Sequence, residues 1–348
     1  MAIIDRPQDY FNTVLYTGNG STQSITGVGF QPDLIWVKSR SNTEPHIWTD
    51  VVRGANKNIR SNATSSEFTD ANNITSFDSD GFSVGTGGAV NENTYTFASW
   101  NWKAGTSVSG DTTGSGTLKT YTGSVNTTSG FSIINFVGNG TAGHTIPHHL
   151  GVAPKMVIVK NRTSGSTSWQ TYHYNLDNGA GTNEIFLDGT GATNGSAGAW
   201  NNTAPSSTVI TKGTGSYGNE NNSNHIMYSF AEKQGYSKFG SYTGNGNVDS
   251  PFIYTGFKPA FFMTKEYTNS SGWKIFDNKR ANGFNQITET LDASSSDDIR
   301  TYNADFLSNG VKLRTSTSFI NETGESYIYM AFAENPLVGS NFVPTTAR

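Results

Sequence analysis

Residues Gly29–Arg40 read GFQPDLIWVKSR, and this pattern decides the fold because it occurs three times. The second copy is Gly151–Arg162 (GVAPKMVIVKNR), and the third is Gly256–Tyr267 (GFKPAFFMTKEY). In each copy a Gly-x-x-Pro turn leads into a short apolar run that reaches a lysine. Proline fixes φ and has no N–H to donate, so it suits the start of a strand. The run after it predicts a buried strand of about six residues.

Other motifs accompany each copy in the same order. An aromatic-x-Gly-Asn-Gly turn precedes it at 16–20, 136–140 and 242–246, and a tryptophan follows it at Trp48, Trp169 and Trp273. An aromatic strand closes each repeat at 94–100, 225–232 and 327–334. The prolines at 32, 154 and 259 are 122 and 105 residues apart, a spacing that suits a whole small domain.

The repeats predict an all-β chain of three tandem antiparallel β-sandwich domains, jelly-roll-like, with short terminal arms. The predicted boundaries are an N-terminal arm at 1–13, repeat 1 at 14–104, repeat 2 at 117–235, repeat 3 at 236–336 and a C-terminal arm at 337–348. Residues 105–116 contain mostly Gly, Ser and Thr and predict a flexible linker. In the N-terminal arm, Tyr10 and Phe11 are the residues expected to anchor it.

Composition narrows the class of protein. Only 14% of residues are charged, and 39 are glycine, which fits a protein with many turns between short apolar strands. The absence of cysteine excludes disulfides and thiolate metal sites. A net charge of −4 without a basic stripe argues against nucleic-acid binding. The sequence contains no apolar run of about 18 residues, so no membrane span is predicted. The first residues lack the apolar core of a signal peptide.

Two stretches resemble metal sites. Asp78 and Asp80 begin an Asp-x-Asp-Gly pattern, but position 5 is Phe82 and no glutamate ends the loop, so a hairpin turn is favoured over calcium. The three histidines within 144–149 have no carboxylate nearby, and the last two are adjacent, so they would point opposite ways along a strand. A polar turn is the favoured interpretation, and no metal or cofactor is predicted.

Catalytic patterns are equally weak. Asp297 and Asp298 are neighbours in a Ser-rich turn and would not face each other as glycosidase carboxylates do. Glu232 and Glu334 follow equivalent Phe-Ala pairs, where repeat 1 has Asn101, and this favours packing or a turn hydrogen bond. The sequence therefore predicts no catalytic residue and a protein that is not an enzyme.

Tryptophans are the remaining candidates for ligand binding. Trp48, Trp169 and Trp273 recur in all three repeats, which favours buried positions with bonded indole N–H groups over sugar-stacking platforms. Trp200 lies in a stretch of loop-like composition. It is therefore the candidate for a surface contact with a ligand.

As a set, these motifs resemble repeated domains of bacteriophage virion proteins, which are abundant in marine phages and are commonly called tail-fibre or structural proteins. The set comprises Tyr-Thr-Gly-Asn-Gly, Gly-Phe-x-Pro, Val-Lys-Asn-Arg at 159–162, Ile-Tyr-Met-Ala-Phe-Ala-Glu at 328–334 and Val-Pro-Thr-Thr-Ala-Arg at 343–348. The resemblance covers 14–348 and carries over no catalytic residue. Repeat 1 departs from it by ending Trp-Asn-Trp-Lys at 100–103.

The resemblance implies a non-enzymatic virion protein, with other virion proteins as partners and a homo-oligomer, a trimer, as its assembly. A tail-fibre or host-attachment component that binds cell-surface glycan is the leading hypothesis. The alternative is a capsid or tail decoration protein held by its terminal arms. A glycan depolymerase is a third hypothesis, which the missing pair of facing carboxylates disfavours.

Overall fold

The computed structural model describes the 348-residue chain except for residues 1–2, 196, 281–284, 342 and 346–348. The described chain is built from antiparallel strands, so the predicted all-β class is confirmed. Two sheets have eight strands, one has six and two have three. The only helices in the described part are short turns of three or four residues.

Repeat 1 contains one large and one small sheet. The large sheet has the order β1-β9-β3-β4-β5-β6, and the small one has the order β2-β8-β7. Their bounds are η1 Pro7–Asp9, β1 Phe11–Thr17, β2 Gln23–Thr26, β3 Leu34–Ser39, β4 Ile47–Asp50, β5 Lys57–Arg60, β6 Phe68–Thr69, β7 Ile74–Asp78, β8 Gly81–Val84, α1 Gly88–Asn91 and β9 Thr96–Trp102.

Repeat 2 continues in the same way, with an added leading strand pair. Its large sheet is β10-β12-β13-β20-β15-β16-β17-β18, and its small sheet is β11-β14-β19. The bounds are β10 Thr106–Asp111, β11 Thr113–Gly114, β12 Thr120–Asn126, β13 Phe131–Val137, β14 His144–Pro147, β15 Met156–Asn161, β16 Gln170–His173, η2 Tyr174–Leu176, β17 Asn183–Phe186, β18 Asn194–Gly195, α2 Ala197–Trp200, β19 Val209–Lys212, α3 Ser216–Asn219 and β20 Asn224–Phe230.

In repeat 3 the strands form one continuous sheet, β21-β28-β23-β24-β25-β26-β27-β22. The bounds are β21 Ser237–Thr243, β22 Phe252–Tyr254, β23 Phe257–Glu266, β24 Lys274–Asp277, β25 Ile287–Asp292, β26 Arg300–Leu307, β27 Gly310–Leu313, α4 Ser318–Asn321 and β28 Ser326–Pro336.

The strand after each Gly-x-x-Pro turn is the centre of its sheet. β3, β15 and β23 each pair with the closing aromatic strand on one side (β9, β20, β28) and with the next strand on the other (β4, β16, β24). All six residues of β3 and of β15 are buried, as are the last eight of β23. Strands whose two faces are both apolar must be covered on both sides.

One face of each central strand packs inside its own repeat. In repeat 1, Ile35 and Val37 of β3 form a core with Ile25, Phe82 and Val84 of the small sheet. Equivalent cores lie in repeat 2, around Ile146 and Ile210, and in repeat 3, around Val311 and Leu313. Each repeat therefore has an apolar core of its own on this face of its central strand.

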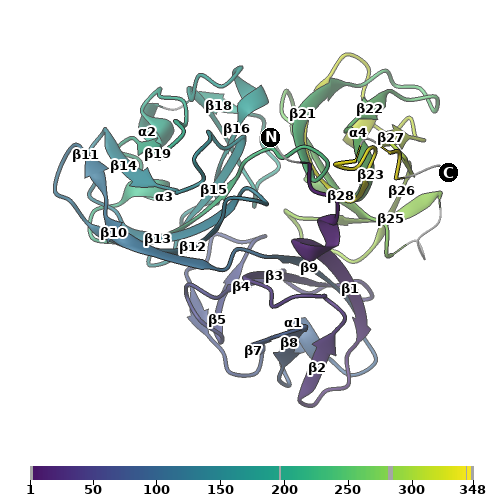
Figure 1. The fold of residues 1–348 in the computed structure, drawn as a ribbon, viewed down its shortest axis with the longest axis horizontal. Coiled ribbons are helices and arrows are strands. Elements are labelled where there is room, and N and C mark those ends of the chain that lie inside the picture. Colours follow the sequence, from purple (N-terminus) through teal and green to yellow (C-terminus); the bar gives the residue numbers. More distant parts are fainter. Residues whose placement is uncertain (1–2, 196, 281–284, 342, 346–348) are drawn as a thin grey trace.

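The opposite faces of the three large sheets meet in a single shared core. Residues from all three repeats belong to it, including Trp36 and Trp100, Ile158 and Trp169, and Phe261 and Phe332. Figure 1 shows the result as three lobes around a common centre, with β1–β9 at the bottom, β10–β20 at the left and β21–β28 at the right. The repeats are therefore arranged as a ring and share their largest core.

Two segments differ from the sequence-based predictions. Residues 105–116 are not a free linker, because β10 pairs along its whole length with β12 and β11 pairs with β14. Backbone pairing satisfies this polar stretch even though its side chains are mostly exposed.

The N-terminal arm is also largely integrated into the fold, since β1 begins inside it at Phe11. The Phe11 ring stacks on Phe332 of repeat 3, 5.1 Å between ring centres, and Tyr10 packs edge-on against Tyr236 at 6.0 Å. The predicted anchoring by these two aromatic residues is confirmed. In the C-terminal arm, Ser340 donates to the Asp5 carboxylate, while 342 and 346–348 lie outside the described residues.

Candidate functional site

A closed ring of hydrogen bonds joins the three repeats around the shared core. In each repeat, one residue lies just before the strand that follows the central strand (β4, β16 or β24). The ring N–H of this residue donates to a backbone carbonyl in a neighbouring repeat, that of the last residue of β5, β17 or β25. The three bonds are His46 Nε2 to Asp292 O at 3.1 Å, Trp169 Nε1 to Arg60 O at 3.0 Å and Trp273 Nε1 to Phe186 O at 2.9 Å. Repeat 1 thus bonds to repeat 3, repeat 2 to repeat 1, and repeat 3 to repeat 2.

This ring corrects the predicted equivalence of the tryptophans. Trp169 and Trp273 are equivalent, but the residue that matches them in repeat 1 is His46, since it also precedes the strand partner of β3. His46 Nδ1 accepts the Trp36 indole N–H at 2.7 Å, so Nε2 carries the proton that is donated to Asp292. Burial lowers the pKa of His46 well below its usual range, which keeps this imidazole neutral. Trp48 is buried as predicted, but its indole N–H has no hydrogen-bond partner among the described residues.

A second ring uses the last residue of β4, β16 and β24. Asp50 accepts the Tyr228 hydroxyl at 2.7 Å, Asp277 accepts the Trp100 indole N–H at 3.1 Å, and His173 Nε2 donates to Tyr329 O at 3.0 Å. Both carboxylates also hold a fully buried arginine three residues later, with Asp50–Arg53 at 2.5 Å and Asp277–Arg280 at 2.6 Å. Repeat 2 has His173 and Leu176 at these two positions, so one junction is neutral and two are charged.

A buried lysine lies at each junction, on the face of the central strand that points to the shared core. The ammonium groups of Lys38, Lys160 and Lys265 donate to backbone carbonyls of their own repeat, and two of them also donate to a carbonyl of a neighbouring repeat. Lys160 reaches Thr64 O at 3.1 Å, and Lys265 reaches Thr190 O at 3.0 Å. Burial lowers the pKa of each of these lysines to about 8.

Three asparagines that sequence reasoning missed explain the Gly-Asn-Gly turns. Asn91, Asn219 and Asn321 end α1, α3 and α4, are fully buried, and accept the backbone N–H of the turn asparagine at 2.9 to 3.1 Å. The first glycine of each turn lies against the backbone carbonyl of the glutamate that comes directly after the buried asparagine. A Cβ on Gly138 would be 2.3 Å from Glu220 O. The Asn-Glu pair that recurs at 91–92, 219–220 and 321–322 is the sequence feature that could have identified these asparagines.

The histidine-rich stretch in repeat 2 forms separate contacts. His144 bonds to Asn219 and Thr112, His148 bonds to Ser206 O, and His149 bonds to the Tyr121 hydroxyl. The described residues contain no group of three or more His, Asp or Glu side chains placed to hold a metal ion.

The acidic candidates also have protein partners. Asp78 lies at a hairpin between β7 and β8, as predicted, and accepts the Ser76 and Ser83 hydroxyls. Asp80 accepts the backbone N–H groups of Gly27 and Gly29. Three further acids form ion pairs, Asp297 with Arg300, Glu232 with Lys238 and Glu334 with Lys258.

Trp200 does not have the exposed position expected of it. The side chain is 1% exposed, and the Lys212 ammonium lies 3.6 Å from the centre of its ring, inside the core of repeat 2. Its short helix α2 is packed against β19. The surrounding Gly and Asn residues suggested a surface loop, but the indole is buried in the core of repeat 2.

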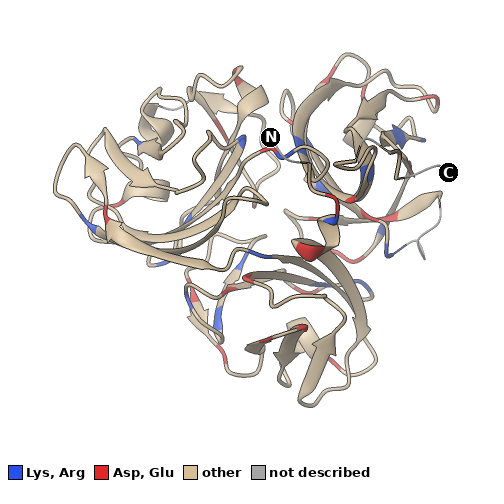
Figure 2. Cartoon of the chain, viewed as in Figure 1, with Lys and Arg blue, Asp and Glu red and all other residues tan. Residues whose placement is uncertain are grey.

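Three clefts lie between neighbouring repeats, each near the Gly-x-x-Pro end of a central strand. They are named here by the two repeats that line them. Cleft 1–2 has a volume of about 560 Å³ and is lined by Gln31, Lys103 and Ser107 among others. Cleft 2–3 has about 550 Å³ and cleft 3–1 about 320 Å³. Figure 2 shows that charged residues are sparse over the fold, so the few charges in these clefts set their electrostatic character.

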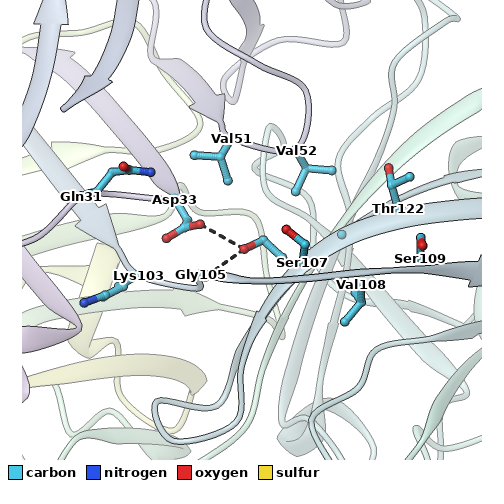
Figure 3. Close-up of a pocket in the computed structure, with 12 residues that line it drawn as sticks. Gln31, Asp33, Val51, Val52, Lys103, Gly105, Ser107, Val108, Ser109 and Thr122 are labelled. Atoms are coloured by element: carbon cyan, nitrogen blue, oxygen red, sulfur yellow. Dashed lines mark hydrogen bonds between the residues drawn. The ribbon is translucent and has the colours of Figure 1, made fainter. Parts of the chain in front are cut away.

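Asp33 lies at the wall of cleft 1–2 (Figure 3). Its carboxylate accepts the Ala104 N–H at 2.9 Å and the Ser124 hydroxyl at 3.0 Å, and that hydroxyl accepts the Gly105 N–H. Burial raises the pKa of Asp33. These bonds fix the path of the chain from repeat 1 into repeat 2, so Asp33 has a structural role in this cleft.

Comparison with known proteins places the chain in one family. The model of a domain of unknown function, DUF7483, matches residues 6–336. The chain belongs to this family. A search of curated proteins and a search of solved structures each find no match.

The family match spans the three repeats and the segments that join them. Both hydrogen-bond rings and all three clefts therefore lie within the matched region. No described helix is long and apolar enough to cross a membrane.

Proposed function

We propose that this chain is a non-enzymatic structural component of a bacteriophage particle and that it serves in a tail fibre or another host-attachment structure. The observation that carries the proposal is the ring of three sequence-related repeats, locked to one another by buried hydrogen bonds around one core. Such a body resists shear between its parts, as a component of an attachment structure must. The motif set that resembles phage virion proteins points in the same direction.

In this proposal the three repeats are homologous β-sandwich domains that have become one rigid unit. The equivalent positions of His46, Trp169 and Trp273 support descent from a common domain, because each donates to the same carbonyl position of a neighbour. The homotrimer implied by the resemblance remains part of the proposal. It would combine three such chains and thus nine repeats.

Host attachment would act through multivalent contact with cell-surface glycan. Weak binding by single sites is multiplied when several sites are held at fixed distances, because the second contact forms at high effective concentration. The polar, weakly charged composition of the chain, with many Asn, Ser, Thr and Tyr residues, suits adaptable hydrogen bonding to sugars.

The alternative, a capsid or tail decoration protein, needs terminal arms that are free to reach neighbours. Two contacts favour attachment over this alternative. Ile4 is buried and its N–H donates to Gln234 O, and the N–H of Ser340 in the C-terminal arm donates to Asp5 at 2.6 Å. Residues of both arms thus form contacts within the chain. A glycan depolymerase is disfavoured because Asp297 and Glu232 each pair with a cation.

Electron cryo-microscopy of intact particles that carry this chain tests the proposal. We expect density for the three-lobed body at the distal end of the tail. Density spread over the shell, or along the tail tube, would overturn the attachment function and favour decoration. Absence of the chain from purified particles, judged by mass spectrometry, would overturn the virion role itself.

A further inference from the structure

Cleft 2–3 differs from the other two clefts in its charge. It is lined by Lys155 and Lys233 of repeat 2, by Lys238 of repeat 3 and by one acid, Glu232. Three ammonium groups and one carboxylate leave an excess of two positive charges (3 − 1 = 2) in a chain whose net charge is −4. Tyr254 adds an aromatic side chain that is 58% exposed.

The fold does not require these lysines. Lys155 follows the proline of the Gly-x-x-Pro turn, where repeat 3 has Ala260, and Lys233 follows the closing aromatic strand, where repeat 3 has Asn335. Lys238 on β21 corresponds to Asn12 on β1, judged by their pairing with the closing strands. Ala260, Asn335 and Asn12 all line cleft 3–1. The same framework therefore forms with neutral residues at all three positions.

Two of the three ammonium groups have no carboxylate partner among the described residues. Lys238 pairs with Glu232 at 2.7 Å. Lys155 lies 3.4 Å from the centre of the Tyr174 ring, and neither it nor Lys233 forms an ion pair with a carboxylate of the described chain. Partial burial lowers the pKa of Lys233, because desolvation disfavours the charged ammonium.

We propose that cleft 2–3 binds an acidic sugar, a pyranose that carries a carboxylate. The ammonium groups of Lys155 and Lys233 bind the carboxylate, and the exposed face of Tyr254 stacks on the ring. The exposed side chain of Gln234, which also lines the cleft, supplies polar groups for the sugar hydroxyls. A volume of about 550 Å³ accommodates one or two sugar units. The inference deepens the proposed glycan attachment and rests on it.

Titration calorimetry of the full chain with D-glucuronate, D-glucose and inorganic phosphate tests the site. We expect glucuronate to bind with a Kd on the order of 1 mM, weaker at high salt, and glucose and phosphate to bind at least about fivefold more weakly. Equal binding of glucose would overturn the role of the lysines. Equal binding of phosphate would overturn sugar recognition.

Matched variants locate the binding. Lys155→Ala with Lys233→Asn introduces the residue types that repeat 3 already has at these positions, so the fold is retained, and we expect the Kd for glucuronate to rise at least about fivefold. Lys279→Ala removes one charge from cleft 3–1 and should leave the Kd unchanged. Unchanged binding by the double variant would overturn the proposal.

The two proposals fail separately. Loss of glucuronate binding in solution would leave a distal position in the particle untouched, so only the sugar site would be rejected. Density on the shell, together with retained glucuronate binding, would reject attachment and keep the site.

Discussion

Asp277 closes the ring between the last and the first repeat, and its removal tests whether that closure stabilises the fold. Its carboxylate binds the Arg280 guanidinium at 2.6 Å and the Trp100 indole N–H at 3.1 Å, and both members of the ion pair are fully buried. Asp277→Ala leaves a buried charge without its partner, which costs about 3–5 kcal/mol. Loss of the bond to Trp100 adds about 1 kcal/mol. We expect the free energy of unfolding to fall by about 4–6 kcal/mol.

The matched control comes from repeat 2, which has a histidine and a leucine where repeat 3 has Asp277 and Arg280. Asp277→His combined with Arg280→Leu removes both charges together and should cost less than about 2 kcal/mol, because no buried charge is left unpaired. Urea unfolding followed by tryptophan fluorescence measures both variants. A fall of less than about 1 kcal/mol in the free energy of unfolding of the single variant would rule out the cost of an unpaired buried charge. An equal fall in the two variants would rule it out as well.

Two further predictions concern the junction lysines and the Gly-Asn-Gly turns. The pKa of Lys38, Lys160 and Lys265 is about 8 in the folded chain, below the value of about 10.4 for a free lysine, so the unfolded chain binds more protons between these values. Stability should therefore rise with pH, by about 1 kcal/mol for each lysine between pH 7.5 and 9, as measured by urea unfolding; a flat or falling profile would contradict this. Gly138→Ala should lower the melting temperature markedly, because its Cβ would meet Glu220 O, whereas Gly191→Ala, with open space around it, should have little effect. Equal melting temperatures for the two glycine variants would exclude the close-approach explanation.

Local features of the fold were predictable because they depend on neighbouring residues. Proline at position 32 and the apolar run after it define β3 without reference to the rest of the chain. The Asp-Gly pair at 80–81 and the Asn-Gly pair at 309–310 lie at hairpins for the same reason. Trp48, Trp169 and Trp273 are all buried as predicted, although only Trp169 and Trp273 occupy equivalent positions.

The ring itself was not predicted, because it depends on which faces of distant sheets meet. The signal was present in the central strands, whose runs LIWV, MVIV and AFFM are apolar at every position instead of alternating. A strand with two apolar faces needs cover on both sides, and the core inside its own repeat covers only one of them. Trp48 and Trp169 were treated as equivalent because both are tryptophans. The strand register shows instead that His46 is the residue equivalent to Trp169.

Clefts 1–2, 2–3 and 3–1 were missed for a related reason. Lys155 and Lys233 are 78 residues apart in sequence (233 − 155 = 78), and Tyr254 belongs to the next repeat. The ring arrangement of repeats 2 and 3 brings them into one cleft. Trp200 was misplaced because composition describes the neighbours of a residue along the chain and does not report what packs against its side chain.

If the three repeats form one cooperative body around a shared core, they unfold together, and differential scanning calorimetry measures whether they do. For 348 residues a single transition has an enthalpy of about 240 kcal/mol, at about 0.7 kcal/mol per residue. We predict one transition whose van't Hoff enthalpy equals this calorimetric value. Separate transitions, or a van't Hoff enthalpy of about 80 kcal/mol, would mean that the repeats unfold independently and do not form one cooperative body.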